Sequence, residues 1–220
     1  MRREIVTSAI GILVFTLLLG IVYPLVITGV GQVAFPGNAN GQQVKLNGQL
    51  IGSKIIGQSF SRPVIGKNGK PEEKKGVIVT EPDPRYFQSR PSATEGGANN
   101  AAASTFSNKG PNSTRTAEAD EENIKAYLEL NRRYDPALTV AKIPVDAVNT
   151  SGSNLDPEIS QANAWIQAHR VAALRRLSLA RVNGLIAQYT SGRGLGFSGE
   201  QGVNVLELNL ALDRLTGGGN

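Results

Sequence analysis

Residues Ile5 to Val30 read IVTSAIGILVFTLLLGIVYPLVITGV, 26 residues without a charged side chain. A helix that spans the hydrocarbon core needs about 20 apolar residues, so this run predicts one transmembrane helix with some tilt. A cleaved signal peptide is the alternative, but its apolar region is typically about 7–15 residues long and no Ala-x-Ala site follows here. Arg2 and Arg3 precede the run, and the next basic residue is Lys45. The positive-inside rule therefore predicts that residues 1–4 are cytoplasmic and that everything after the span lies outside.

Two pairs of small residues lie four positions apart within this run: Thr7 with Gly11, and Thr16 with Gly20. Such small-xxx-small spacing lets the backbones of two membrane helices approach closely. Glycine and threonine are also common in any spanning helix, so the pattern alone leaves a specific partner contact open. Gly11 and Gly20 are the candidate residues for such a contact. Pro24 lies late in the run, where a kink or the end of the helix disturbs the span least.

The chain after the span predicts a linker and one domain. Residues 31–41 form the linker, because Phe35 to Gly41 is rich in turn-forming residues. Residues 42–220 predict one extracytoplasmic domain of the α+β class, with early strands and later helices. Val44 to Ile51 predicts a β-hairpin, because Asn47-Gly48 supplies the positive φ angles of a two-residue type I′ turn. Further expectations are a strand-like run over 55–60, an exposed loop over 62–75 and a strand over 77–79.

The second half of the domain predicts mostly helices. Residues 92–116 carry almost no large apolar side chain, so they predict a long surface loop. Helices are then expected at 117–134 after Thr116, after Ser160, at 179–189 after Ser178, and after Asn204. Asn204 and Glu207 have the spacing of a capping box. The alternation Leu206, Leu208, Leu210, Leu212 would also fit a strand, but the helical spacing of Val205, Leu208 and Leu212 favours a helix.

The composition and motifs exclude several classes of chemistry. The chain has no cysteine, so it has no disulfide, thiolate metal site or cysteine nucleophile. Its net charge of +5 forms no basic stripe with interleaved aromatics, which argues against nucleic-acid binding. His169 is the single histidine, and a lone histidine is usually a packing or surface residue. No phosphate loop, P-type phosphorylation sequence or nucleophile elbow occurs. The sequence therefore predicts a chain that is not an enzyme on its own.

One turn-rich stretch, Asn149 to Pro157, has two interpretations. The backbone amides and hydroxyls of Ser151, Gly152, Ser153 and Asn154 could cradle an anion such as a nucleotide phosphate. Alternatively, the stretch is a tight loop in which Asp156 caps a helix and Pro157 occupies its first position. The second interpretation explains every residue and is preferred.

Six stretches together resemble the C subunit of the bacterial Kdp potassium-transporting P-type ATPase. In the order of that family they are Phe35-Pro36 with Ala39-Asn40-Gly41; Gly52 to Phe60; Tyr86 to Ala93; Pro144-Val145-Asp146 with Ser151 to Pro157; Gln167, Arg170, Val171, Ala172 and Arg175; and Val203 to Asp213. Each is weak alone, but six in the right order are specific. The chain departs from the family in an insertion over 61–84, in an incomplete motif over 107–112, and at Asn154, where the family has glycine.

The resemblance implies an accessory, non-catalytic subunit in the bacterial plasma membrane. Its partners would be the P-type subunit that hydrolyses ATP and the channel-like subunit that binds potassium. The family is described as an assembly factor or catalytic chaperone that raises the ATP affinity of the hydrolysing subunit. The resemblance gives this chain no cofactor of its own, since ATP acts on the complex. Because ATP is cytoplasmic and the domain is expected outside, any effect on ATP would have to travel through the partner subunits.

The motif residues are expected to be structural or interfacial. The candidates for the partner interface are Gly11 and Gly20 in the span, and Gln58, Phe60, Arg90, Pro91, Asn204, Glu207 and Asn209 in the outer domain. Two other classes of function remain open: an anchored extracytoplasmic binding module for a small solute, and an anchored hydrolase. A concave apolar pocket with convergent polar groups would favour the first. A nucleophile and a base within hydrogen-bond reach would favour the second.

Overall fold

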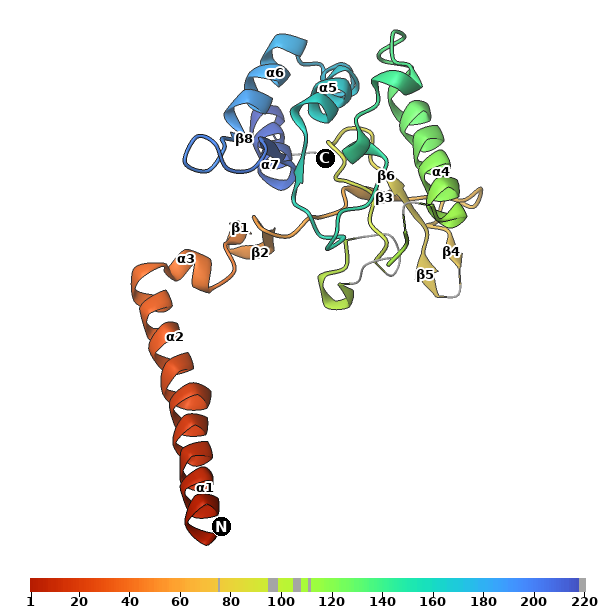
Figure 1. The fold of residues 1–220 in the computed structure, drawn as a ribbon. Helices are drawn as coiled ribbons and strands as arrows, with labels where there is room; N and C mark the ends of the chain where they lie inside the picture. Colours follow the sequence, from red (N-terminus) through yellow and green to blue (C-terminus); the bar gives the residue numbers. More distant parts are fainter. Residues whose placement is uncertain (75, 95–98, 105–107, 111, 218–220) are drawn as a thin grey trace. The chain divides into compact units, whose positions relative to one another are not determined.

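The computed structural model describes residues 1–74, 76–94, 99–104, 108–110 and 112–217. It divides into two compact units, Met1–Ser53 and Lys54–Asn220, which are described separately. The first holds one long helix and a hairpin, and the second combines early strands with later helices, so the predicted α+β class is confirmed (Figure 1). The first hairpin belongs to the same compact unit as the long helix; the start of the outer domain at residue 42 stays a prediction.

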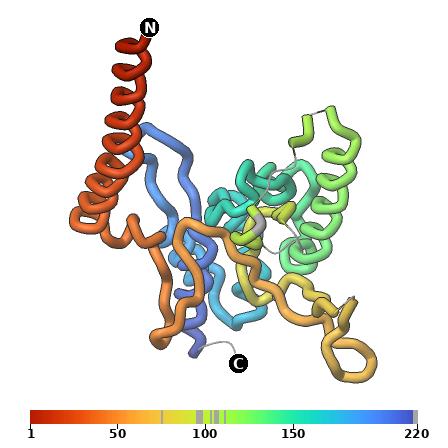
Figure 2. The backbone as a smooth tube through the Cα atoms, turned by 90° about the horizontal axis from the view of Figure 1, so that it is seen from below, coloured from red at the N-terminus to blue at the C-terminus, as the bar shows by residue number. Residues whose placement is uncertain are grey.

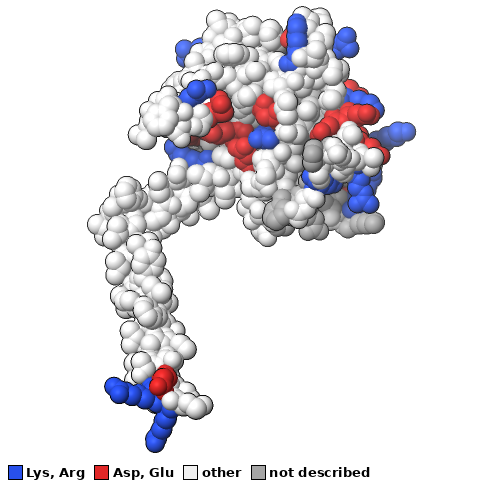
Figure 3. Space-filling view, viewed as in Figure 1, with Lys and Arg blue, Asp and Glu red and all other residues white. Residues whose placement is uncertain are grey.

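The long helix of the first unit runs without a break from Arg2 to Ala34 and is long and apolar enough to cross a membrane. It consists of α1 (Arg2–Leu17), a π-helical turn (Leu18–Val22) and α2 (Tyr23–Ala34). Its charged side chains gather at its beginning (Figure 3). The helix continues past Pro24. In the π-helical turn before it the hydrogen bonds reach one residue further back than in an α-helix, and the Tyr23 amide donates to the Leu18 carbonyl. Because proline has no amide hydrogen, Pro24 leaves no donor without a partner at this point.

The predicted linker is partly helical, and the predicted hairpin is confirmed. After Phe35 the chain forms the short α3 (Pro36–Ala39), then β1 (Gln43–Leu46) and β2 (Gln49–Ser53), which pair in antiparallel. The turn residues Asn47 and Gly48 have φ angles of 50° and 82°. Both lie in the left-handed region that a type I′ turn requires.

Among its described residues, the strands of the second unit form three small antiparallel sheets. β3 (Ser61–Pro63) pairs with β6 (Thr80–Pro82), and β4 (Glu73–Lys74) pairs with β5 (Val77–Ile78). Figure 2 shows this insertion projecting from the body of the unit. In the predicted loop over 62–75, the described residues 62–74 are mostly exposed. They include most of β3 and all of β4, whose pairing with β6 and β5 periodicity did not reveal. The third sheet has the order β7 (Glu158–Ile159), β9 (Gly202–Asn204), β8 (Thr190–Ser191).

The strand-like run predicted over 55–60 is wrong. These residues form a turn and an irregular segment instead. At Gly57 the amide donates to the Leu155 carbonyl at 2.6 Å, and a Cβ there would lie 2.5 Å from the Asp156 carbonyl oxygen. This close approach uses the Gly57 amide, which is then not available to a strand partner.

The described part of the second unit also contains four α-helices: α4 (Thr114–Asn131), α5 (Gln161–Arg175), α6 (Leu179–Gln188) and α7 (Val205–Thr216). Short 3₁₀ turns lie at Ala101–Ala103, Val140–Lys142 and Val145–Ala147. The predicted caps are confirmed at three helices, where the side chains of Ser160, Ser178 and Asn204 accept amide hydrogens of the first turn. The choice of helix over strand for the leucine-rich α7 is also confirmed.

Two predicted helix starts are wrong, and one predicted capping box is incomplete. α4 begins at Thr114, because the Ser113 carbonyl already accepts from the amides of Thr116 and Ala117. Asp156 caps no helix: residues 158–159 stay extended, pair with β9 and bury Ile159 in the core. The capping box at Asn204 is only half formed, since Glu207 pairs with Lys54.

The predicted loop over 92–116 falls partly on residues 95–98, 105–107 and 111, which lie outside the described residues; residues 107 and 111 belong to the incomplete 107–112 motif. Thr94 and Asn99, which flank residues 95–98, are buried, so these two residues of the predicted surface loop pack against the domain. The main core packs α5, α6, α7 and the third sheet around Phe87. A smaller cluster of Tyr127, Leu138 and Ala147 lies beneath α4. Phe87 thus brings the segment that precedes the loop into the core.

Candidate functional site

The Tyr86 to Ala93 motif lies in a segment, residues 83–94, that forms no helix or strand. Buried backbone amides and carbonyls need hydrogen-bond partners, and an irregular segment has no ladder to supply them. In this chain, side chains from α5, α7 and the 149–156 loop supply them. We call residues 83–94, held in this way, the clamped segment.

Asn209 on α7 holds the clamped segment at its most buried residue. Its Oδ1 accepts the Phe87 amide hydrogen at 2.9 Å, and its Nδ2 donates to the Phe87 carbonyl at 2.9 Å. The Asn209 side chain is 0% exposed. One residue further, Gln167 on α5 repeats the pattern: it accepts from the Gln88 amide at 2.7 Å and donates to the Gln88 carbonyl at 3.1 Å. The two amide side chains therefore act as strand partners for Phe87 and Gln88.

Arg170 is a fully buried guanidinium that binds neutral oxygens. It donates to the carbonyls of Pro84 and Tyr86 at 2.9 and 2.7 Å, and to the side chains of Gln167 and Asn131. Burial lowers the pKa of Arg170 to about 10, so the side chain remains charged at neutral pH. The sequence offered Arg170 only as a motif match. Its backbone partners lie more than 80 positions away, so no local pattern could have revealed them.

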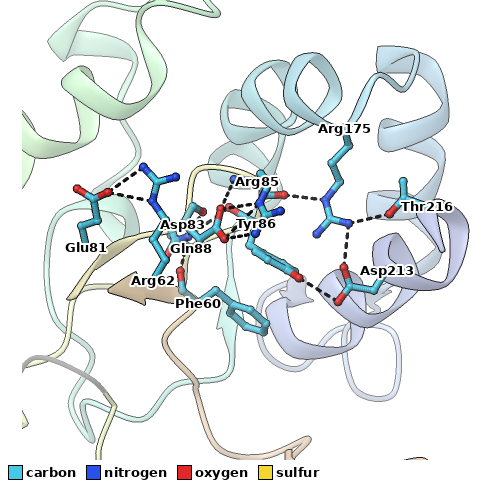
Figure 4. A network of polar contacts seen from close by, with 10 residues as sticks. All are labelled: Phe60, Arg62, Glu81, Asp83, Arg85, Tyr86, Gln88, Arg175, Asp213 and Thr216. Atoms are coloured by element: carbon cyan, nitrogen blue, oxygen red, sulfur yellow. Dashed lines mark hydrogen bonds and ion pairs between the residues drawn. The ribbon is translucent and has the colours of Figure 1, made fainter. Parts of the chain in front are cut away.

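A second arginine closes the start of the segment (Figure 4). Arg175 donates to the Arg85 carbonyl at 2.8 Å, pairs with Asp213 at 2.8 Å and lies over the Tyr86 ring at 4.4 Å. The Tyr86 hydroxyl donates to the other Asp213 oxygen at 3.3 Å. Burial, and then the charge of Asp213, raise the pKa of Tyr86. Asp83 is also buried; burial alone would raise the pKa of that carboxyl, but the hydrogen bonds from Arg85 lower it.

Arg90 joins the clamped segment to the 149–156 loop. Its guanidinium pairs with Asp156 at 3.1 Å and donates to the Asn149 side chain at 2.9 Å and the Thr150 carbonyl at 3.2 Å. Its Nε is buried and has no partner among the described residues. Pro91 follows, half-buried. Arg90 is thus oriented inward, although one of its donors is left over.

The candidate anion loop, residues 151–154, uses many of its polar groups within the chain. Asn154 is almost fully buried, accepts the Ala93 amide through Oδ1 at 2.8 Å, and accepts from Ser92 and Asn99 through its carbonyl. The Ser153 hydroxyl accepts the Leu155 amide. Gly152 is exposed, and Ser151 is buried.

Asn154, which the resemblance in sequence set against a glycine, has a φ of 58°. Asparagine is among the few residues other than glycine that adopt this left-handed conformation readily. The substitution therefore keeps the backbone turn and adds a side chain that holds Ala93.

The remaining candidate interface residues are spread over both units. In the second unit, Phe60 stacks on Tyr86 with ring centroids 5.4 Å apart, and the Gln58 carbonyl accepts from Ser89 at 3.0 Å. Asn204 caps α7 and also donates to the Lys54 carbonyl at 2.8 Å. In the first unit, a Cβ at Gly11 or Gly20 would meet nothing within 4 Å. The structure brings Gln58, Phe60 and Arg90 to the clamped segment but does not gather all the candidates into one patch.

A cleft of about 210 Å³ lies beside the clamped segment. Its lining combines amide side chains with apolar ones, and Arg90 is the one charged residue among the described residues that line it. The lining residues are Ser59, Pro82, Gln88, Ser89, Arg90, Pro91, Ser92, Asn99, Asn123, Ala126, Tyr127, Leu130, Asn131, Ala147, Asn163 and Gln167. The Tyr127 hydroxyl donates to Asn163, and burial raises the pKa of Tyr127. Within the described ranges, no three His, Cys, Asp or Glu side chains are placed to hold a metal ion.

Comparison with known proteins identifies the family. A family model described as KdpC, the c chain of K⁺-transporting ATPase, matches residues 5–214. A potassium-transporting ATPase KdpC subunit of Mycobacterium bovis (strain BCG / Pasteur 1173P2) is 46% identical over 215 residues, which is 98% of this chain and 100% of that protein. KdpC subunits of Methylococcus capsulatus and Koribacter versatilis are 46% and 40% identical, over 93% and 97% of this chain and 94% and 95% of theirs. The chain therefore belongs to the KdpC family of potassium-transporting ATPase subunits.

Proposed function

We propose that this chain is an accessory, non-catalytic subunit that supports the assembly and stability of the potassium-transporting ATPase. Its partners in this proposal are the P-type subunit that hydrolyses ATP and the channel-like subunit that binds potassium. The observation that carries the proposal is the use made of the polar motif residues. Asn209, Gln167, Arg170 and Arg175 all bind the backbone of the clamped segment. Groups engaged in this way fix a shape for docking and are not free to act on a substrate.

The second unit lies outside the cytoplasm in this proposal. Arg2 and Arg3 begin the apolar helix, and the first basic residue after it is Lys45. Short flanks rich in Lys and Arg stay on the cytoplasmic side, so the N-terminus is cytoplasmic and the hairpin and second unit are outside. The chain is then a single-pass subunit of the plasma membrane.

Any rise in the ATP affinity of the hydrolysing subunit passes through the partner subunits. ATP is cytoplasmic, and in the candidate anion loop the Asn154 and Ser153 side chains already serve as acceptors for amides of the chain itself. A coupling between distant sites requires only that both bias the same equilibrium between states of the complex. In this account, docking of the chain favours the state of the complex that binds ATP tightly.

The cleft beside the clamped segment supports a second candidate, an extracytoplasmic module that binds a small solute. Its amide-rich lining and its buried, unpaired Arg90 Nε suit a small polar ligand. Ligand pockets usually measure about 300–1,000 Å³, and this cleft, at about 210 Å³, is smaller. The accessory role is therefore the better supported of the two.

Co-purification tests the proposal. The chain, tagged at its C-terminus, would be expressed with the other ATPase subunits and extracted in a mild detergent. We expect the P-type subunit to be recovered with it, and the KM for ATP of complexes formed without the chain to be raised. A chain that is recovered alone from membranes that contain the other subunits would contradict the accessory role. Binding of a small solute by the chain alone, measured by calorimetry, would favour the second candidate.

A further inference from the structure

The hairpin between β8 and β9 ends in an exposed apolar tip, residues 194–198. Leu195 is 90% exposed and Phe197 is 77% exposed, the two highest values for large apolar side chains among the described residues of the second unit. The tip projects from the helical body in Figure 1 and Figure 2. The core of the unit gains nothing from these two side chains. Their apolar surface is therefore available for another molecule.

The tip is held in one conformation by its own hydrogen bonds. Gly194 and Ser198 exchange two backbone bonds, of 2.7 and 2.8 Å, and the Gly196 amide donates to the Arg193 carbonyl at 3.0 Å. At the base, Arg193 pairs with Glu200 at 3.2 Å. Binding through a preorganised loop loses less conformational entropy than binding through a flexible one. The exposed side chains are thus presented on a stiff support.

Leu195 has a φ of 54°, in the left-handed region. This conformation brings the Cβ close to the following carbonyl oxygen, so glycine or asparagine would occupy it at lower strain. A leucine here neither relieves strain nor fills the core. Backbone strain of this kind is typical of residues that act in recognition or function.

We propose that this tip inserts Leu195 and Phe197 into an apolar pocket on another protein subunit of the complex; this inference rests on the proposed accessory function. A few side chains that fill desolvated pockets at the centre of an interface contribute most of its binding energy. A protein pocket suits the tip better than an anionic lipid surface, because residues 194–199 carry no charge and Arg193 is paired with Glu200. Attraction to anionic headgroups depends on unpaired Lys and Arg residues.

Two polar substitutions in the full chain test the proposal during co-expression with the other subunits. Leu195→Asn keeps the left-handed turn but removes the apolar side chain, and Phe197→Ser removes the ring. We expect each to weaken association with the complex about tenfold or more, while the thermal unfolding temperature of the chain stays equal or rises for Leu195→Asn. Val77→Thr is the matched control, because Val77 is also exposed (69%) but lies on β5. It should leave recovery unchanged.

A fluorescent reporter separates a protein pocket from lipid. The chain has a single tryptophan, so Trp165→Phe with Phe197→Trp places the only indole at the tip. We expect its emission to shift to the blue in the assembled complex and not in nanodiscs that contain the chain alone. A blue shift in nanodiscs alone, or unchanged recovery for both tip variants, would overturn the proposal. Recovery of wild-type chain without partners would instead overturn the accessory function itself.

Discussion

Replacing Asn209 with alanine removes both hydrogen bonds that hold Phe87. The side chain is 0% exposed, and its partners are the amide and the carbonyl of the same buried residue, at 2.9 Å each. Alanine leaves both backbone groups without a partner, in a place that water does not reach. Each unsatisfied buried group costs about 1–3 kcal/mol, so the expected loss is about 4 kcal/mol. Because folded domains are stable by about 5–15 kcal/mol, this loss removes a large share of the total.

The measurement is urea and thermal unfolding of the full chain in detergent micelles, followed by the fluorescence of Trp165, which lies on α5 of the second unit. For a unit of this size, a loss of about 4 kcal/mol lowers the unfolding temperature by about 8–16 °C. The control is Asn68→Ala, which removes an exposed side chain that accepts the Lys70 amide in the insertion. Its effect should stay within about 0.5 kcal/mol.

Asn209→Ala should lower the stability of the chain without preventing it from folding. The variant should still fold at low temperature, because Phe87 remains in a core of α5, α6 and α7. A loss of stability below about 1 kcal/mol would contradict the role of Asn209 in holding Phe87. It would mean that the Phe87 amide and carbonyl find other partners, or that the segment is not held there.

Three further predictions concern the membrane, the helix and pH. A cysteine at the exposed Asn100 should react with a membrane-impermeant thiol reagent on intact cells, and reaction only after lysis would reverse the outside placement. Gly11→Ile or Gly20→Ile should lower recovery of the complex without preventing membrane insertion, because close helix packing needs a small side chain; unchanged recovery for both would assign assembly to the second unit. Burial raises the pKa of Tyr127, so the unfolded chain releases that proton first and stability falls as the pH rises above about 10. Urea midpoints at pH 8 and pH 10.5 should therefore differ more for wild type than for Tyr127→Phe, and equal differences would contradict the assigned burial.

Sequence patterns predicted the features that short-range geometry decides. Asn47-Gly48 specifies a type I′ turn within two residues, and the hydroxyls of Ser160 and Ser178 accept amides three residues ahead. The apolar run was equally clear, since length and the absence of charge suffice. These elements form for reasons contained in a few neighbouring residues.

Other features depended on residues far apart in the chain and could not be predicted. Asp156 has the spacing of a helix cap, but the pairing of residues 158–159 with β9 keeps the chain extended there. The clamped segment has no periodic pattern at all. Its partners Gln167 and Asn209 lie 79 and 122 positions from the groups they bind. The sequence motifs placed Gln167, Asn209 and the Tyr86 to Ala93 stretch in one family pattern. The fold shows that the two side chains bind the backbone of that stretch.

The most direct test of the account is to compare complex recovery with ATPase turnover per recovered complex in Arg90→Ala. Arg90 joins the clamped segment to the 149–156 loop through Asp156, Asn149 and Thr150. If the motif residues act by holding a shape for docking, recovery should fall severalfold while turnover per intact complex stays within about twofold of wild type. Arg62→Ala, which removes an exposed ion pair with Glu81, is the matched control and should change neither quantity. Normal recovery of a complex whose ATPase activity is abolished by Arg90→Ala would contradict the account and assign this arginine a direct part in the reaction.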